Sequence, residues 1–243
     1  MKLPAIAPSD VLSYGEMCQV EGAHLQRGMN FRLRGGLSVV LMSVQPNALY
    51  ADALEDEGRT LIYEGHNAPL SPDCPRPDDE DQPAQLPSGR LTQNGLFHEA
   101  AERFKRGEEV AELVKVYEKL RPGIWIYNGT FRLTDAWRVE QGERRVWKFR
   151  LELLEETTGE TPSSSPLVEP SRVIPSHIKL EVWRRDGGKC AKCGSDRDLH
   201  FDHILPFSKG GTSSNAANIQ LLCQACNLEI GRASCRERGC STV

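Results

Sequence analysis

The chain has 243 residues and a formal net charge of −4, with 39% hydrophobic and 26% charged residues. These values are typical of a soluble globular protein of two domains, and they argue against a general nucleic-acid coat protein, which would be strongly basic. No stretch approaches the ~20 apolar residues that a membrane span needs, so we expect a cytoplasmic protein without a membrane partner.

Residues 1–154 have the sequence pattern of a strand-rich domain. Their β-branched and aromatic residues, with partial alternation and Gly or Asn turns, predict strands at 37–44, 59–65, 123–139 and 144–154. Residues 95–107 are the clearest helix, and residues 110–120 are ambiguous but favour a strand. Because strands and helices do not alternate, we expect an α+β fold with a curved sheet or open barrel and flanking helices.

Composition marks the remaining segments. Residues 155–175 are rich in Ser, Thr, Pro and Glu and hold few large apolar side chains, which predicts a flexible interdomain linker. Residues 71–89 have the composition of a polar surface loop. Residues 176–229 would then form a second, small domain that begins with an amphipathic helix. Residues 230–243, "IGRASCRERGCSTV", fit neither domain and are expected to be a non-native or disordered tail.

Two CxxC pairs lie in the second domain. They supply the four thiolates Cys190, Cys193, Cys223 and Cys226, which is the ligand set of a closed structural Zn²⁺ site. In a cytoplasmic chain this arrangement indicates a metal rather than disulfides. A domain this small has little core, so a metal would stabilise it. Residues 194–222 exceed the usual spacing within a zinc ribbon, so another element is inserted between the two pairs.

The inserted segment resembles a known nuclease motif. "DHILPFSKGG", a following Asn218, and "LLCQACN" ending at Asn227 resemble the HNH nuclease motif of the ββα-metal fold. The resemblance covers essentially all of residues 180–229. It implies a small zinc-stapled endonuclease domain that hydrolyses phosphodiester bonds with a single divalent ion, Mg²⁺, Mn²⁺ or another.

The chemistry of hydrolysis fits these residue types. His203 is a natural general base because a neutral imidazole is present at physiological pH. Asp202 offers a hard oxygen to a Mg²⁺-type ion, and Asn227 can supply a second. By resemblance, His203 is the general base, Asp202 and Asn227 are the metal ligands, and Asn218 orients the imidazole and braces the loop. His200 could lie near the phosphate or simply be exposed, and the second reading is favoured.

A second resemblance covers about residues 30–154. "ALYADALEDEGRTLIYEGHN" (48–67), "GRLTQNGLF" (89–97) and "RPGIWIYNGTFRLTDAW" (121–137) follow the order of motifs in the SRA (YDG) domain of the PUA-like superfamily, which reads modified cytosine. The signature "YDG" appears here as "YNG", and the family's "YTG" appears as "YEG". The resemblance implies an SRA-like curved β-barrel.

In the SRA family a flipped base lies between two tyrosines, and an aspartate reads its edge. Mapped by position, Tyr50 and Tyr63 would form the sandwich and Asp52 would accept a hydrogen bond from the cytosine amino group. A carboxylate in this role discriminates against thymine. Asp56 is the substitute for Asp52, and Tyr127 would be a structural residue of the signature.

Together the two resemblances imply a modification-dependent, type IV-like restriction endonuclease. It would bind double-stranded DNA that contains 5-methylcytosine or 5-hydroxymethylcytosine and cut nearby, in bacterial defence against phage or foreign DNA. One HNH site cuts one strand, so we expect a homodimer. Two alternatives stay open: an HNH nicking or non-specific nuclease whose first domain reads no modified base, and a non-catalytic methyl-DNA reader.

Overall fold

The computed structural model describes residues 6–33, 36–72, 74–154, 173–205 and 210–229. We call residues 6–154 the N-terminal region and residues 173–229 the C-terminal region. The predicted tail and all of the predicted linker except residues 173–175 lie outside the described residues. Among the described residues, no helix is long and apolar enough to cross a membrane.

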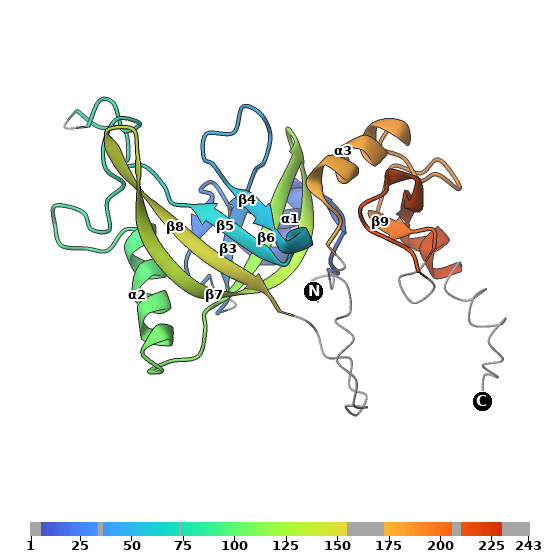
Figure 1. Ribbon diagram of the computed structural model, residues 1–243. Helices are drawn as coiled ribbons and strands as arrows, with labels where there is room; N and C mark the ends of the chain where they lie inside the picture. Colours follow the sequence, from blue (N-terminus) through green and yellow to red (C-terminus); the bar gives the residue numbers. More distant parts are fainter. Residues whose placement is uncertain (1–5, 34–35, 73, 155–172, 206–209, 230–243) are drawn as a thin grey trace.

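One twisted sheet forms the N-terminal region (Figure 1). Its strands, in spatial order, are β2 (Met29–Asn30), β3 (Ser38–Met42), β6 (Leu113–Arg121), β7 (Ile124–Gln141), β8 (Arg144–Leu153), β5 (Thr60–Glu64) and β4 (Ala53–Glu55), and β1 (Val11–Ser13) also pairs with β7. All neighbours are antiparallel except β3 and β6, which are parallel. The predicted strands are confirmed, including the ambiguous one at residues 110–120.

The sheet curves because β-bulges interrupt the pairing of its long strands. Register shifts fall between Val116 and Tyr117 in the β6–β7 pair and between Leu133 and Asp135 in the β7–β8 pair. Such bulges bend a strand and increase its twist. The curved sheet, the helices and the separate C-terminal region confirm the predicted α+β class.

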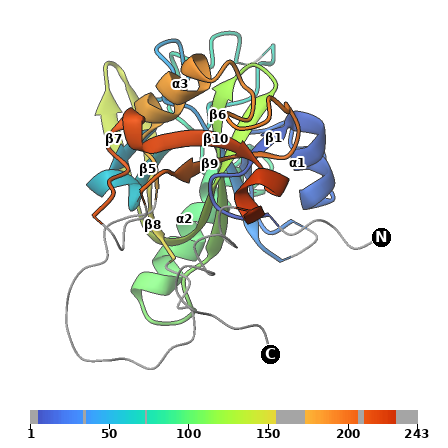
Figure 2. The same cartoon turned by 90° about the vertical axis from the view of Figure 1, so that its right-hand side faces the viewer.

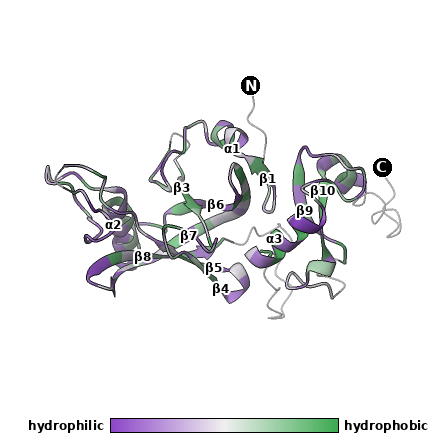
Figure 3. Ribbon diagram, turned by 90° about the horizontal axis from the view of Figure 1, so that it is seen from above, coloured by the Kyte–Doolittle hydropathy of each residue, from purple (hydrophilic) through white to green (hydrophobic). Residues whose placement is uncertain are grey.

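Helix α2 (Gln93–Lys105) covers one face of the sheet. It begins two residues before the predicted start because the Thr92 side chain accepts a hydrogen bond from the Gly95 backbone amide. Phe97 and Ala101 of α2 pack into the main core, which includes Tyr63. Figure 3, seen from above, shows apolar stretches along β3 and β7.

Two short helical elements of the described N-terminal region were not expected from the sequence. Helix α1 (Tyr14–Glu21) begins with a capping box between Ser13 and Glu16, and Gly22 ends it in a left-handed conformation. The 3₁₀ helix η1 (Asp56–Gly58) forms the turn between β4 and β5.

The C-terminal region consists of a helix, a hairpin and a helical end. Helix α3 (Ser176–Arg185) is followed by β9 (Leu199–His203), the 3₁₀ helix η3 (Ala216–Asn218) and β10 (Ile219–Cys223), and residues 224–229 are helical. Strands β9 and β10 are antiparallel, so His203 lies opposite Ile219. Figure 2 shows α3 beside this hairpin.

The two regions share a hydrophobic core. Leu120 of β6 and Ile126 of β7 belong to the same buried cluster as Ile178 and Val182 of α3. Ile174, inside the predicted linker, is 1% exposed and joins this cluster. The backbone amide of Phe201 in β9 also donates to the carbonyl of Ser9 over 3.1 Å. The C-terminal region is therefore packed against the sheet through side chains and backbone.

Candidate functional site

The four predicted zinc ligands lie together. Their Sγ atoms are all within 4.8 Å of one another, and Sγ of Cys193 lies 3.6 Å from Sγ of Cys223. A tetrahedral zinc site with bonds of about 2.3 Å separates its sulfurs by about 3.8 Å. The cluster therefore fits a structural Zn²⁺ ion, as the sequence predicted.

Backbone hydrogen bonds fix the first cysteine pair against the hairpin. The amide of Ala191 donates to the carbonyl of Leu221 in β10 over 2.8 Å, and the amide of Gly194 donates to the carbonyl of Cys190 over 2.8 Å. The loop that carries Cys190 and Cys193 is thus attached to the strand that ends at Cys223. This arrangement brings together cysteines that lie far apart in the sequence.

His203 ends strand β9 and is half-buried. Its Nε2 atom lies 2.9 Å from Oγ of Ser213, a partner that the sequence did not reveal. Burial lowers the pKa of His203 below its ordinary value, and the neighbouring charge of Asp202 partly opposes this shift. The imidazole is therefore neutral at physiological pH, which is the form a general base requires.

Asn218 connects the two ends of the loop after β9. Its Oδ1 accepts from the amide of Leu205 over 2.8 Å, and its Nδ2 donates to the carbonyls of Leu205 and Thr212 over 3.1 and 3.0 Å. A Cβ atom on Gly211 would overlap the carbonyl of Leu205, so this close approach requires glycine. These contacts suit the predicted bracing role, and the predicted orientation of the imidazole stays a prediction.

The two predicted ligands of the divalent ion lie on β9 and on the helical end that follows β10. Asp202 precedes His203 in β9 and pairs with Gln220 of β10, and Asn227 follows Cys226 in the helical end. Both side chains are half-buried. A carboxylate and an amide oxygen suit Mg²⁺ or Mn²⁺. Their joint binding of an ion stays a prediction.

His200 lies at the contact between the two regions. Its backbone forms an antiparallel bridge with Asp10, and its buried Nε2 has no hydrogen-bond partner among the described residues. Burial raises the pKa of Asp10, and the charge of His200 opposes that shift. This histidine belongs to the contact with the N-terminal region and is not simply exposed, contrary to the favoured sequence reading.

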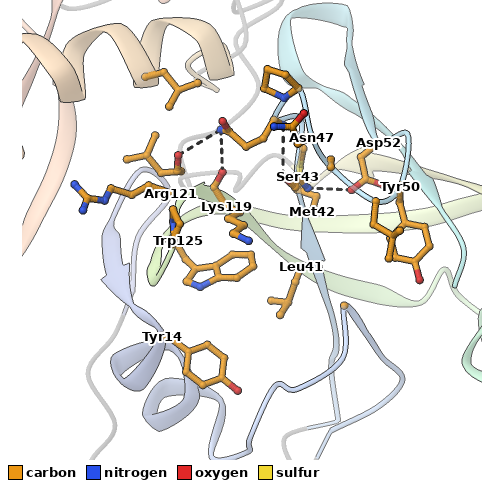
Figure 4. Close-up of a pocket in the computed structure, with 18 of the residues that line it drawn as sticks. Tyr14, Leu41, Met42, Ser43, Asn47, Tyr50, Asp52, Lys119, Arg121 and Trp125 are labelled. Carbon is orange, nitrogen blue, oxygen red and sulfur yellow. Dashed lines mark hydrogen bonds between the residues drawn. The ribbon is translucent and has the colours of Figure 1, made fainter. Parts of the chain in front are cut away.

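A groove of about 1180 Å³ runs between the N-terminal region and α3. Tyr50 and Asp52 line one end, and Leu180 and Trp183 of α3 line the other. Figure 4 shows Lys119, Arg121 and Trp125 across the groove from Tyr50 and Asp52. The charged residues of the described lining are Arg27, Lys119, Arg121 and Arg184, which are basic, and Asp52, which is acidic. The groove therefore favours a polyanion.

Buried polar contacts position the loop that holds Tyr50 and Asp52. The carboxylate of Asp52 accepts from the backbone amides of Ser43 and Glu64, each over 3.0 Å. Ala51 lies between Tyr50 and Asp52 in this loop. The backbone amide of Ala51 donates to the carboxylate of Glu64 over 3.1 Å, and the carbonyl of Ala51 accepts from Nζ of Lys148 over 3.0 Å. Lys148 also pairs with Glu64 at 2.8 Å. The glutamate of "YEG" thus supports the loop.

Burial raises the pKa of Asp52 from 3.8 to about 7. The backbone hydrogen bonds from Glu64 and Ser43 and the charge of Lys148 oppose this shift without cancelling it. Asp52 therefore holds a carboxylate that changes protonation near neutral pH. Asp56, the substitute candidate, instead accepts from Oγ1 of Thr60 within the β4–β5 turn.

The ring of His66 contacts both predicted sandwich tyrosines. It stacks on Tyr50 with ring centroids 4.9 Å apart and planes inclined by 8°, and its Nε2 lies 3.1 Å from the hydroxyl of Tyr63. Tyr63 is 1% exposed and belongs to the main core, whereas Tyr50 lines the groove. A Cβ atom on Gly28 would come within 2.7 Å of Nε2 of His66, so glycine leaves space for the ring.

His66 is uncharged at neutral pH. Burial, with a smaller effect from the charge of Arg27, lowers its pKa to about 4. A neutral imidazole has a flat aromatic face, so it can stack on tyrosine as a base does. The sequence reading missed this residue because its position beside Tyr50 depends on the fold. The only signal in the local sequence is that the imidazole of His66 stands three residues after Tyr63.

Part of the C-terminal region matches a known protein family. Residues 190–232 match the sequence profile of the HNH endonucleases. The predicted HNH identity is thereby confirmed for this segment, which contains the four cysteines, His203, Asn218 and Asn227. We call residues 173–229, which include the described part of this segment and α3 before it, the HNH region from here on. No curated protein matches the chain.

Solved structures with a similar fold include SRA domains. The SUVH5 SRA domain with hemimethylated CG DNA has a TM-score of 0.45 and 19% sequence identity, covering 67% of this chain and 97% of that one. The same domain bound to fully hydroxymethylated CG DNA has a TM-score of 0.45 and 20% sequence identity, with the same coverage of both chains. KRYPTONITE in complex with mCHH DNA, an H3(1–15) peptide and SAH gives 0.43 and 19%, covering 69% of this chain and 35% of that one.

Proposed function

We propose that the chain is a modification-dependent DNA endonuclease. The N-terminal region binds a modified cytosine taken out of the duplex, and the HNH region hydrolyses a phosphodiester bond nearby. The observation that carries this proposal is the basic groove, which has Tyr50 and Asp52 at one end and helix α3 of the HNH region at the other.

Recognition of the base rests on stacking and on one carboxylate. The face of Tyr50 supports a flat ring, and stacking of one base on an aromatic side chain contributes about 1–3 kcal/mol. Asp52 accepts a hydrogen bond from the cytosine amino group, which thymine lacks. Lys119 and Arg121 contact the phosphate backbone, which adds affinity independent of sequence.

Cleavage rests on His203 and the groups around it. The neutral imidazole takes a proton from the attacking water, and Ser213 holds the ring through its hydroxyl. Asp202 and Asn227 would hold a Mg²⁺ or Mn²⁺ ion, which supplies positive charge that stabilises the leaving oxygen. A zinc ion held by the four cysteines would keep β10 and the helical end in place.

The biological setting follows from the chemistry. An enzyme that cuts only DNA with modified cytosine spares unmodified DNA in the same cell, so we place it in bacterial, cytoplasmic defence against phage or foreign DNA, as a type IV-like restriction endonuclease. One HNH site cuts one strand. A double-strand break therefore requires a homodimer or two binding events.

Cleavage of matched plasmids tests this proposal. Plasmids of identical sequence that carry cytosine, 5-methylcytosine or 5-hydroxymethylcytosine are incubated with the protein and Mg²⁺ or Mn²⁺. We expect cutting of one or both modified plasmids only. Equal cutting of all three would instead indicate a non-specific HNH nuclease. Selective retention of modified DNA without cutting would indicate a reader without catalysis.

Two variants separate the two activities. His203→Ala should lower the cleavage rate by at least about 100-fold, since a general base contributes at least that factor, and leave binding of modified DNA intact. Tyr50→Ala should abolish the preference for modified DNA and leave the HNH region folded. If His203→Ala also abolishes binding, the two activities are not separable and the division of roles is wrong.

A further inference from the structure

Lys179 forms a buried polar network between the two regions. It lies on α3 of the HNH region and is 1% exposed. Its Nζ lies 2.7 Å from Oε2 of Glu118 in β6 and 2.8 Å from Oδ1 of Asn128 in β7. Nδ2 of Asn128 donates to the same Oε2 of Glu118 over 2.9 Å. Each of the three side chains thus contacts the other two.

The contacts of this network keep the carboxyl of Glu118 in its charged form. Burial alone would raise the pKa of Glu118, but the charge and hydrogen bond of Lys179, together with hydrogen bonds from Ser176 and Asn128, outweigh burial and lower it. A buried charge without a counter-charge is strongly unfavourable. The ion pair is complete when α3 is seated against β6 and β7 in the observed position. Displacement of α3 would leave the charge of Glu118 without Lys179, with the neutral amide of Asn128 still bound to it.

The identity of residue 128 fits the network. Asn128 is the middle residue of "YNG", the position at which the SRA signature has aspartate. Its amide group accepts from Lys179 through Oδ1 and donates to Glu118 through Nδ2. A carboxylate at this position would place a second negative charge beside Glu118, and it could not donate. Asparagine in place of the signature's aspartate therefore suits the ion pair that Glu118 forms with Lys179 of α3.

Apolar and backbone contacts hold α3 and the hairpin at the same place. Leu120 and Ile126 flank the network on β6 and β7 and pack in one cluster with Ile178 and Val182 of α3. On the other side, the amide of Phe201 in β9 donates to the carbonyl of Ser9. Contacts on two elements of the HNH region oppose its rotation about either one.

We propose that Lys179, Glu118 and Asn128 form a clamp that fixes the HNH region relative to the base pocket. The clamp rests on the proposed function, and it means that cleavage falls at one fixed distance from the modified base. A free tether with the length of residues 155–175 would instead allow a reach of roughly 25 Å and many cut positions. The three side chains are positioning residues, because they act through the placement of the HNH region.

Mapping of cut positions tests the clamp. A 60-base-pair duplex with one 5-methylcytosine is end-labelled, and its products are separated at single-nucleotide resolution. The wild type should give one dominant cut position on any strand that it cuts. Lys179→Met should spread the same total cleavage over several positions and change the Kd for the modified duplex by less than about twofold. Glu181→Gln, on the exposed face of α3, is the matched control and should retain the single position.

A charge swap tests whether pairing, and not packing alone, fixes the position. Lys179→Glu and Glu118→Lys should each spread the cut positions, and the double variant should narrow them again. A single dominant cut position in Lys179→Met would overturn the clamp. So would a double variant whose cut positions are spread as widely as those of the two single variants. Zinc content and circular dichroism of each variant show whether the HNH region is folded.

A second measurement needs no DNA and so does not depend on the proposed function. A protease site is inserted within residues 155–172, and the cleaved protein is run on a size-exclusion column. The two fragments of the wild type should elute together, and those of Lys179→Glu should separate. Separation of the wild-type fragments would overturn the clamp even if cleavage of modified plasmids were selective. Conversely, unselective cleavage with co-eluting fragments would overturn only the proposed function.

Discussion

The ring of His66 lies between the two side chains that the sequence assigned to the base sandwich. It is stacked on Tyr50 at 4.9 Å and lies 3.1 Å from the hydroxyl of Tyr63 by its Nε2. A base that uses this face of Tyr50 would need the space that the imidazole fills. Binding of the base therefore requires His66 to move, which breaks one ring stack and one hydrogen bond.

His66→Ala should tighten binding of modified DNA. The lost stack and hydrogen bond cost about 1–2 kcal/mol to break, so their removal should lower the Kd by about tenfold. Fluorescence anisotropy with a duplex that carries one 5-methylcytosine measures this Kd in the wild type and in the variant. His98→Ala is the control, because His98 contacts Trp147, with ring centroids 4.6 Å apart, away from the groove. A loss of affinity like that of Tyr50→Ala would show that His66 itself stacks on the base.

Binding of modified DNA should depend on pH through Asp52. Its pKa is raised to about 7, chiefly by burial, so the carboxylate becomes protonated as the pH falls from 8 to 6. The protonated acid is a poorer acceptor for the cytosine amino group. The ratio of affinities for a duplex with one 5-methylcytosine and a duplex with thymine at that position should therefore fall over this range. In Asp52→Asn this ratio should be low and independent of pH, and a flat ratio in the wild type would contradict the assigned role.

Residues within short motifs could be predicted, and their distant partners could not. The cysteine pairs have the spacing of a zinc site, and the resemblance to the HNH motif pointed to His203 and Asn218. Ser213 became visible as the partner of His203 only when the loop was folded. Lys179 lies 51 residues from Asn128 in the sequence, and no periodicity links the two.

At the scale of elements, strands were predictable because burial on the sheet imposes alternation. The pairs β6–β7 and β7–β8 have the β-branched and aromatic residues that this packing requires. Helix α1 was missed because only Met17 and Val20 of its eight residues are buried, so it has little apolar periodicity. Its capping box is the stronger signal and is visible as Ser13 followed by Glu16.

Removal of zinc should inactivate cleavage and leave the N-terminal region folded. The cysteine cluster holds the loop after α3, the end of β10 and the helical end together, whereas the main core of the N-terminal region lies entirely within the sheet and α2. A chelator should therefore release zinc, remove cleavage even with Mg²⁺ present, and change the affinity for modified DNA by only a few fold.

Cys193→Ser should have the same effect as the chelator, because it removes one of the four thiolates. Cys74→Ser is the matched control, since Cys74 lies outside the cluster. Re-addition of zinc should restore cleavage in the chelated wild type but not in Cys193→Ser. Full cleavage by protein shown to be free of zinc would contradict a structural role for the cluster.

At the scale of the whole molecule, the sequence suggested two domains on a tether. Composition alone supported this view, since residues 155–175 lack large apolar side chains over most of their length. Residues 173 and 174 are nevertheless buried, and Ile174 joins the cluster shared by α3, β6 and β7. Composition could not reveal this packing because the surfaces involved become complementary only after each region folds. The groove that Tyr50 and Asp52 share with Leu180 and Trp183 of α3 results from the same packing.

The central claim is that recognition of a modified base directs cleavage by the HNH site. The most direct test is a competition in one tube between a labelled duplex with one 5-methylcytosine or 5-hydroxymethylcytosine and an unmodified duplex of different length, with Mg²⁺ or Mn²⁺. We predict that at least one modified duplex is cut at least about tenfold faster, the factor expected when only a modified base leaves the duplex and stacks on Tyr50, and that Tyr50→Ala removes this difference. Equal cutting of modified and unmodified duplexes by the wild type would contradict the account.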